Sequence, residues 1–488
     1  MAEEKALTTR QDDFSAWYNE VVQRAELADY APVRGCMVIR PWGYAIWENM
    51  QRALDDMFKA TGHQNAYFPL LIPLSFIERE KEHIKGFAPE VAVVTHAGGK
   101  ELEEPLVIRP TSETIIYSMF SKWVQSYRDL PLLINQWANV IRWELRTRLF
   151  LRTSEFLWQE GHTAHATEAE AEEETLRILG LYRSFMEDWM AMPPLTGRKT
   201  DSERFAGALR TYACEALMQD NRALQAGTSH NLGQNFARQF DLRFQTETGM
   251  EEYAWNTSWG VSTRLVGGLV MTHGDDAGLV LPPRLAPIQV VIVPIYRTDD
   301  ERGRVLQKAD EVEALLRQSN IRAKVDARDN LKPGSKYYEW ERKGVPARIE
   351  IGPRDVDRGQ AMVVLRTVTG TDLPRKEALP EHGLAETLRA RLDAYQAALL
   401  AAARERREAN SYRGIRSYGE FRELMEGAGG FVYAGWCGSA ACEDRVKDET
   451  RATIRVLPSA EFASAEAPAH CLVCGAQSVS EAVWARAY

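Results

Sequence analysis

One stretch, Asn139 to His165, constrains the fold of this 488-residue chain more than any other. It opens with alternating apolar residues, passes an arginine-rich turn and continues into a second apolar run, NVIRWELRTRLFLRTSEFLWQEGHTAH. Such alternation is typical of half-buried strands, so the stretch predicts an antiparallel hairpin. Side chains two apart on a strand share a face, so Arg142 and Glu144 are expected together on the first strand. Further polar residues lie on or near the return: Arg152, Glu155, Glu160 and His162.

The charged residues of this hairpin suit a polyphosphate and a second, cationic ligand. Guanidinium groups bind phosphate oxygens bidentately and stay charged. A carboxylate such as Glu144 can accept a hydrogen bond from an exocyclic amine, while Glu160 and His162 can receive a cation. A short Arg-x-Glu pattern by itself is more often a solvated ion pair on a two-sided strand. The length of the full string favours the functional interpretation.

The string resembles motif 2 of the class II aminoacyl-tRNA synthetases, and within them the archaeal/eukaryotic-like prolyl-tRNA synthetase family with a C-terminal zinc-binding domain. The resemblance covers nearly the whole chain: residues 40–73 resemble motif 1, which forms the dimer interface in this family, and residues 256–275 resemble motif 3. It implies an α+β protein in three parts. These are a class II antiparallel-sheet catalytic core at 1–285, an α/β anticodon-binding domain at 286–383 and a small zinc-containing α+β domain at 384–488.

The segment after Pro110 predicts an amino-acid-binding site. Thr111 and Glu113 open a helix, where they would serve structurally as an N-cap and a first-turn acid. Functionally, a hydroxyl and a carboxylate match the two N–H donors and single charge of proline's ammonium, and the resemblance favours this interpretation. The resemblance also places Phe87 at the edge of the amino-acid pocket. The proline site implied by the resemblance is Thr111, Glu113, Arg142, Trp158, Glu160, His162, Phe205, His230 and Gly260.

Motif 3 predicts the phosphate end of the site. Arg264 begins an apolar helix, where the helix dipole and the side chain both favour phosphate. By resemblance, Arg142 and Arg264 are the catalytic residues, and Arg152 shares the β/γ end of ATP with Arg264. Mg2+ is expected to bridge the phosphates. The implied ATP site is Arg142, Glu144, Arg152, Thr153, Gln225, Thr228, Ser262 and Arg264.

The chain after residue 288 predicts a small α/β domain. Strand-like and helix-like segments alternate at 288–296, 299–319, 321–326, 335–344, 347–352 and 361–368, and an alanine-rich helix follows at 384–408. By resemblance, Glu341, Arg348 and Arg354 match residues that read the two guanines of the proline anticodon. Arginine with guanine O6/N7 and carboxylate with guanine N1/N2 are chemically suitable pairs.

Four of the six cysteines form two close pairs near the C-terminus, Cys437-x4-Cys442 and Cys471-x2-Cys474. This spacing favours a tetrahedral zinc held by four thiolates over four unrelated reduced thiols. Four thiolates leave no open position, so the metal would be structural. Cys214 is expected in a helix at 207–219 as an inert core thiol. Tyr488 matches a family tyrosine whose carboxylate lies near the active site.

Composition restricts the remaining classes. The net charge of −9 argues against a wholesale nucleic-acid binder, although a local RNA-binding face remains compatible with it. The sequence has no apolar run of about 18 residues, and its charged N-terminus lacks the apolar core of a signal peptide. Six cysteines are too few for a disulfide scaffold. A cytoplasmic location is expected.

The resemblance implies attachment of L-proline to proline tRNA through a prolyl-adenylate made from ATP, by a homodimer. The interval from His165 to Trp259 has no room for the editing insertion of bacterial-type relatives. Activation of the smaller cysteine and alanine is therefore expected, with a separate trans-editing protein to clear the errors. Three alternatives remain: another class II enzyme such as the threonyl or glycyl type, a regulatory relative that binds uncharged tRNA, and a zinc-stabilised RNA-binding module without catalysis.

Overall fold

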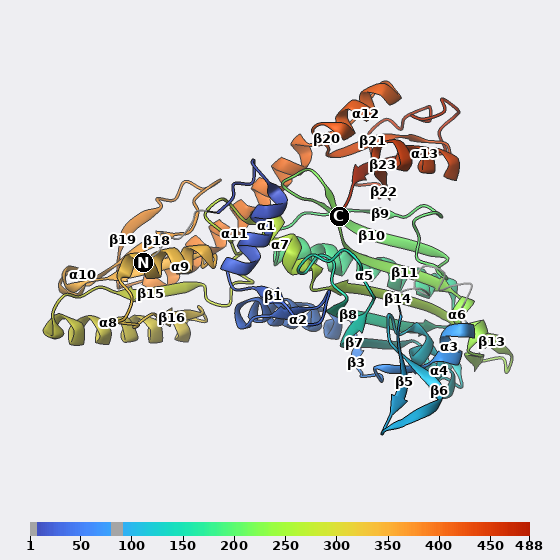
Figure 1. The fold of residues 1–488 in the computed structure, drawn as a ribbon, viewed down its shortest axis with the longest axis horizontal. Helices are drawn as coiled ribbons and strands as arrows, with labels where there is room; N and C mark the ends of the chain where they lie inside the picture. The colour runs from blue at the N-terminus through green and yellow to red at the C-terminus, as the bar shows by residue number, and fades with distance from the viewer. Residues whose placement is uncertain (1–6, 80–90) are drawn as a thin grey trace.

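The computed structural model describes residues 7–79 and 91–488, so the expectation for Phe87 lies outside the described residues. The mixed architecture predicted from the sequence is confirmed (Figure 1). An α/β domain lies at one side of the molecule. The large sheet and the C-terminal domain lie at the other side.

One eleven-stranded sheet runs through both the catalytic part and the C-terminal part of the chain. Its neighbours pair antiparallel, except β3 with β7 and β20 with β21. In spatial order the strands are β20 (Ser411–Tyr412), β21 (Phe431–Trp436), β23 (Ser480–Arg486), β22 (Ala452–Pro458), β9 (Leu195–Arg198), β10 (Arg210–Leu217), β11 (Ala223–Gly233), β14 (Trp255–Ser262), β8 (Glu155–His165), β7 (Leu132–Ile141) and β3 (Gln64–Asn65).

The two parts of this sheet join where β22 pairs with β9, with Leu457 opposite Arg198. A buried charge cluster reinforces the junction. Glu215 of β10 accepts from Lys199 Nζ at 2.7 Å and from Nη2 and Nε of Arg455 at 3.0 and 3.1 Å. The glutamate is fully buried and each cation is nearly so, so each charge depends on the others for compensation.

The main apolar core lies between the sheet and four helices: α1 (Phe14–Arg24), α2 (Pro41–Ala60), α5 (Glu168–Asp188) and α7 (Arg264–His273). The acidic segment that follows the hairpin forms α5. Thr167 and Glu170 form its N-terminal capping box, while Ile178, Tyr182 and Phe185 are buried against the sheet. Most of its acidic residues are solvated, but Glu174 is buried, and one of its carboxylate oxygens lies 3.0 Å from His63 Nε2.

The prediction of a helix at 207–219 was wrong. This segment forms β10, between β9 and β11 in the interior of the sheet. A strand covered on both faces has no clear alternation, because nearly every side chain is buried, so its pattern resembles that of a buried helix. Cys214 is buried as expected, and burial raises the pKa of its thiol.

The hairpin is present, but its first strand is shorter than expected. Strand β7 ends at Ile141, so Arg142 and Glu144 lie in the connection 142–154 rather than on one strand face. The apolar side chains at 149–151 turn into the main core, and Phe150 has a φ of 62°. Because residues 149–151 are buried in the main core, the connection 142–154 does not continue the sheet. The alternating sequence pattern did not reveal this.

The smaller elements of the catalytic part surround the sheet. They include β1 (Ala28–Tyr30) with β2 (Met37–Ile39), β12 (Arg243–Gln245) with β13 (Glu251–Tyr253), and a sheet of β4 (Leu71–Pro73), β6 (Lys100–Ile108) and β5 (Ala92–Ala97). The helices are α3 (Leu74–Arg79), α4 (Glu113–Trp123) and α6 (Asn235–Gln239), and a 3-10 turn spans Tyr127–Asp129. The C-terminal part adds α12 (Tyr418–Glu426) and α13 (Ala440–Thr450).

The α/β domain contains the expected alternation of strands and helices. Its sheet order is β16 (Ala323–Val325), β15 (Val290–Pro294), β17 (Ala347–Ile351), β18 (Gln360–Leu365) and β19 (Lys376–Pro380). The first three strands are parallel and the last two pairings are antiparallel. The helices are α8 (Asp299–Gln318), α9 (Pro333–Arg342) and α10 (Pro353–Arg358).

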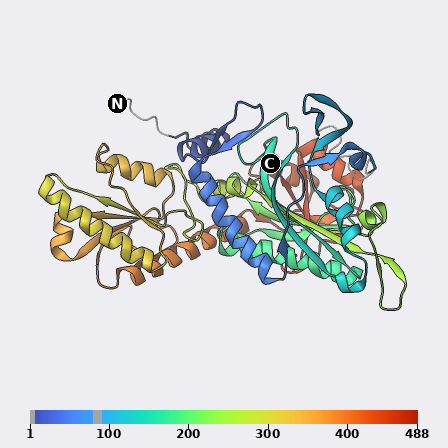
Figure 2. The ribbon, with the colours of Figure 1, turned by 90° about the horizontal axis from the view of Figure 1, so that it is seen from below.

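Helix α11 (Leu384–Ala409) joins two cores. Its first half packs Leu384 and Leu388 into the α/β domain, while Tyr395 and Leu399 pack with Val280 of the catalytic part. Figure 2 shows the helix running from the α/β domain towards the rest of the molecule. The predicted boundary between residues 383 and 384 therefore stays a prediction, because the helix belongs to both neighbours. Among the described residues, no helix is both long and apolar enough to cross a bilayer.

Candidate functional site

A cavity of about 270 Å³ lies over β8, β11 and β14. All nine residues predicted for the proline site line this cavity, as do five of the eight predicted for ATP. The predicted residues that line it are Thr111, Glu113, Arg142, Trp158, Glu160, His162, Phe205, Gln225, Thr228, His230, Gly260, Ser262 and Arg264. Segments far apart in the sequence thus contribute to one space.

A buried carboxylate marks one part of the cavity. Glu160 accepts from Ser112 Oγ at 2.5 Å and from Gln136 Nε2 at 2.8 Å, and its other oxygen lies 2.9 Å from His162 Nε2. Burial alone would raise the pKa of Glu160, but the bonds from His162, Ser112 and Gln136 outweigh it and lower the pKa. The cavity therefore holds a fixed negative charge.

Ser112, rather than Thr111, occupies the N-cap position of α4, so the structural interpretation of Thr111 was wrong. The Thr111 hydroxyl instead donates to the Glu113 carboxylate. Both side chains are buried and line the cavity. The pair is thus arranged to present oxygen atoms to a ligand.

His230 lies in the wall of the cavity as a neutral imidazole. Burial, with a contribution from His162, lowers its pKa to about 3. Its Nδ1 lies 2.9 Å from Thr211 Oγ1, and the Phe205 ring lies 4.8 Å from the imidazole between centroids. These contacts fix an aromatic wall suited to a small apolar ring.

Two arginines provide the positive charge of the cavity. Arg142 Nε donates to the Pro110 carbonyl at 2.9 Å, and its guanidinium carbon lies 5.4 Å from the Trp158 ring centroid. Arg264 is the first residue of α7, as predicted, and its Nε donates to Leu151 O at 3.2 Å. Burial, with repulsion from Arg152, lowers the Arg264 pKa. Two constrained guanidinium groups in one cavity favour an anionic ligand.

Three predicted ATP residues, Glu144, Arg152 and Thr153, do not line the cavity. Arg152 Nε contacts Glu144 at 2.7 Å, and the arginine side chain is 58% exposed. Thr153 Oγ1 donates to the Glu155 carbonyl at 2.7 Å. Repulsion from Arg152 helps to lower the pKa of Arg264, although Arg152 does not line the cavity.

Sequence reasoning missed several residues of this site. Ser112 and Gln136 hold Glu160, and Phe156 lines the cavity beside Trp158. Hairpin pairing could have identified Gln136, because it stands opposite Glu160 in the β7–β8 register. Gly161 is another omission: an added Cβ would lie 2.1 Å from the Trp259 indole, so only glycine fits there.

The residues predicted to read the anticodon lie only partly together. Glu341 and Arg348 line one hollow of the α/β domain, whereas Arg354 lies exposed on α10 outside its lining. Glu341 Oε1 accepts from Arg375 at 2.9 Å. Arg348 donates to Glu350 at 2.8 Å, and its guanidinium carbon lies 3.9 Å from the Tyr337 ring centroid.

The four C-terminal cysteines form a cluster. Their sulfur atoms all lie within 4.8 Å of one another, with Cys437 3.6 Å from Cys442 and 3.7 Å from Cys474. Zinc–sulfur bonds of about 2.3 Å in a tetrahedron separate the sulfurs by about 3.8 Å, so this donor set fits zinc. Cys471 completes the set.

Tyr488 lies beside the hairpin connection. Its hydroxyl donates to Asp220 at 2.6 Å, and the Arg148 guanidinium carbon lies 5.6 Å from its ring centroid. The side chain does not line the cavity.

Buried neutral histidines predict acid sensitivity. Burial lowers the pKa of His273 to about 3 and that of His165 to about 4. The unfolded chain binds protons at these sites near pH 6.5 and the folded chain does not. Stability should therefore fall from about pH 6.5 downward, by about 1.4 kcal/mol per pH unit for each such histidine. Urea midpoints at pH 7.5 and 5.5 measure this effect. His273→Gln should remove the contribution of one histidine to this loss of stability. An unchanged pH dependence of the urea midpoint in that variant would contradict the account.

Comparisons with known proteins agree with this geometry. Three family models match: tRNA synthetase class II core domain (G, H, P, S and T) at residues 94–273, anticodon binding domain at 289–390, and prolyl-tRNA synthetase, C-terminal, at 418–488. A proline--tRNA ligase of Chlorobium phaeovibrioides is 56% identical over 486 residues, 99% of each chain. Proline--tRNA ligases of Chloroflexus aurantiacus and a Roseiflexus species are 56% and 55% identical, each over 99% of both chains.

Proposed function

The chain belongs to the prolyl-tRNA synthetases of class II, and we propose how its cavity attaches L-proline to proline tRNA. The observation that carries the mechanism is a single cavity with fixed carboxylates, aromatic walls and two constrained arginines. The threonyl, glycyl, regulatory and zinc-module alternatives lose support, since the full-length relatives named here are proline--tRNA ligases.

Proline occupies the acidic and aromatic part of the cavity. Thr111 and Glu113 receive its ammonium group, whose two N–H donors and one charge match a hydroxyl and a carboxylate. The neutral His230 lies at the same polar end. The pyrrolidine ring fits between Trp158 and Phe205. Glu160, His162 and Gly260 complete the pocket.

ATP occupies the arginine part and enters with Mg2+ as its phosphate counter-ion. Arg142 neutralises the α-phosphate and orients the proline carboxylate. Arg264, helped by the exposed Arg152, holds the β/γ end. Glu144 and Thr153 frame adenine. Gln225, Thr228 and Ser262 complete the nucleotide site.

The reaction needs no side-chain nucleophile. The proline carboxylate attacks the α-phosphorus of ATP, and pyrophosphate leaves. The terminal adenosine hydroxyl of the tRNA then attacks the adenylate carbonyl, and AMP leaves. The protein contributes orientation and neutralisation of the developing phosphate charge, by Arg142 and Arg264.

The remaining parts support this reaction. Glu341, Arg348 and the exposed Arg354 read the anticodon, and Cys437, Cys442, Cys471 and Cys474 hold a structural zinc. Exposed apolar side chains around motif 1, such as Tyr67 at 70% and Tyr44 at 41%, support a homodimer, which light scattering would test. We place the protein in the cytoplasm, to be checked by fractionation.

The test of the function is ATP–pyrophosphate exchange with each of the twenty amino acids. Proline should give strong exchange. Cysteine and alanine should give exchange about 10–200-fold weaker, because lost apolar contact discriminates by only about 1–3 kcal/mol. Such leakage would require a separate trans-editing protein. Strong exchange with another amino acid, or with none, would refute the proposal.

A further inference from the structure

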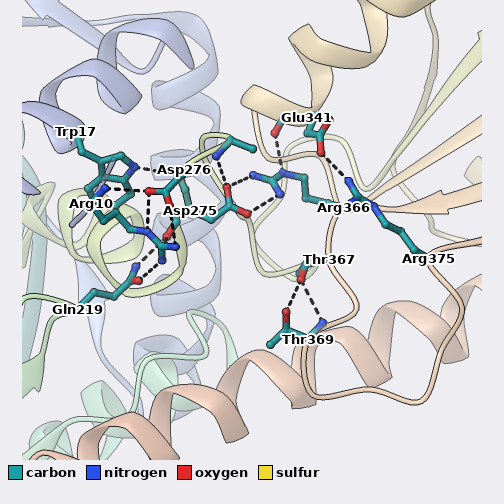
Figure 3. Close-up of polar contacts among 12 residues, drawn as sticks. Arg10, Trp17, Gln219, Asp275, Asp276, Glu341, Arg366, Thr367, Thr369 and Arg375 are labelled. Atoms are coloured by element: carbon teal, nitrogen blue, oxygen red, sulfur yellow. Dashed lines mark hydrogen bonds and ion pairs between the residues drawn. The ribbon is translucent and has the colours of Figure 1, made fainter. Parts of the chain in front are cut away.

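A buried arginine joins the α/β domain to the catalytic part of the chain. Arg366 follows β18, and its side chain is 3% exposed. Two guanidinium nitrogens contact the carboxylate oxygens of Asp275 at 2.8 and 2.5 Å, and Nε donates to the Glu341 carbonyl at 2.8 Å. Figure 3 shows this fork between the two domains. All three guanidinium nitrogens of Arg366 thus form hydrogen bonds, and this one side chain contacts both Asp275 and Glu341.

Asp275 is fixed to the catalytic core. It lies two residues beyond the end of α7, whose first residue is Arg264 in the cavity. The Asp275 carbonyl accepts from Trp17 Nε1 at 2.9 Å, and its backbone pairs with Gly278 in a tight turn (Figure 3). The contact therefore lies at the opposite end of the helix that begins with Arg264.

Glu341 is fixed on the other side of the contact. Arg366 holds its carbonyl, while its carboxylate is directed to Arg375 at the hollow of the α/β domain. The connection between the domains runs alongside, because Leu279 N donates to the Arg342 carbonyl at 3.0 Å. Arg366 thus contacts both Glu341, which is predicted to read the anticodon, and Asp275 at the end of motif 3.

We propose that Arg366 is a positioning residue for recognition of tRNA, which holds the Glu341 hollow in one orientation relative to α7 through Asp275. The inference rests on the proposed function. A tRNA must reach the Glu341 hollow with its anticodon and the cavity with its acceptor end at the same time. When one end of the tRNA is bound, a fixed geometry between the domains raises the effective concentration of the other end at its site. The forked geometry of an arginine–carboxylate pair supplies orientation that a point charge does not.

The test compares Asp275→Asn with Asp276→Asn in the full chain. Asp276 is the matched control, because it is 47% exposed and pairs with Arg10 of the catalytic part at 3.1 Å. Asp275→Asn should lower kcat/KM for proline tRNA about tenfold, mainly through KM for tRNA. Its tRNA-independent proline exchange should stay within about twofold of the unsubstituted chain. Asp276→Asn should leave both rates within about twofold.

Two further measurements separate positioning from general stability. Arg366→Lys keeps the charge but loses the fork, so it should resemble Asp275→Asn, and the double variant should add little to either. Discrimination against proline tRNA with one anticodon guanine replaced by adenine should shrink in both variants, because the Glu341 hollow is no longer held in one orientation relative to α7.

Two results would overturn the inference: aminoacylation by Asp275→Asn and Arg366→Lys that matches Asp276→Asn, or exchange that falls in parallel with aminoacylation. Absence of proline exchange in the unsubstituted chain would refute the proposed function instead.

Discussion

Arg264→Ala is expected to lower proline-dependent ATP–pyrophosphate exchange by about 10²–10³-fold, the usual cost of removing one donor that stabilises transition-state charge. Arg264 is partly buried at the start of α7 and lines the cavity. Its Nε donates to the Leu151 carbonyl at 3.2 Å, so the guanidinium is already oriented before ATP binds. Initial exchange rates at saturating proline and ATP measure the effect.

Arg152→Ala is the matched control for this substitution. Arg152 is an arginine of the same predicted phosphate set, but its side chain is 58% exposed and it does not line the cavity. Its loss should therefore cost less than the loss of Arg264. Equal losses in the two variants, or an Arg264→Ala protein with unchanged exchange, would contradict the assignment. Thermal unfolding of each variant separates lost catalysis from lost folding.

Removal of zinc is expected to produce the largest loss of stability. Cys442 is buried, and its sulfur lies 3.6 Å from that of Cys437. Zinc binding contributes about 10–16 kcal/mol to folding in isolated zinc peptides, so Cys442→Ser should destabilise the C-terminal part by several kcal/mol. Metal content by mass spectrometry, together with the unfolding midpoint, measures this change. Cys36→Ser, outside the cluster and partly exposed, should retain both.

The result that would count against the zinc assignment is equally clear. If the purified chain holds no zinc, or if Cys442→Ser keeps the midpoint of Cys36→Ser, the cluster is four reduced thiols. A chelator should lower the unfolding midpoint of the unsubstituted chain, as Cys442→Ser is expected to do.

The parts of the fold that the sequence predicted are those in which local signals agree with tertiary packing. Helix α7 begins at Arg264 as expected. The α/β domain was predictable because its strands and helices alternate with turns between them. The cysteine cluster was predictable because its spacing reflects the geometry of the metal.

The failures share a physical cause. Strand β10 was predicted as a helix because a strand buried on both faces loses its alternation. Both flanks of the connection 142–154 were predicted as strand around an arginine-rich turn, because the apolar residues there pack into a distant core that no local pattern shows. Ser112 was missed because only the folded chain brings it to Glu160, whereas the hairpin register could have identified Gln136.

The junction of β22 with β9 changes how the C-terminal domain should be understood. An unpaired strand at the border of a sheet presents open backbone groups that can recruit another chain. Because β22 covers β9 in this position, the domain shields the catalytic sheet from such association. A lineage that lost this module would need another cover for β9, together with a new partner for Glu215 in place of Arg455. The domain is therefore a border that the catalytic sheet needs, as well as the part of the chain that carries the four-cysteine cluster.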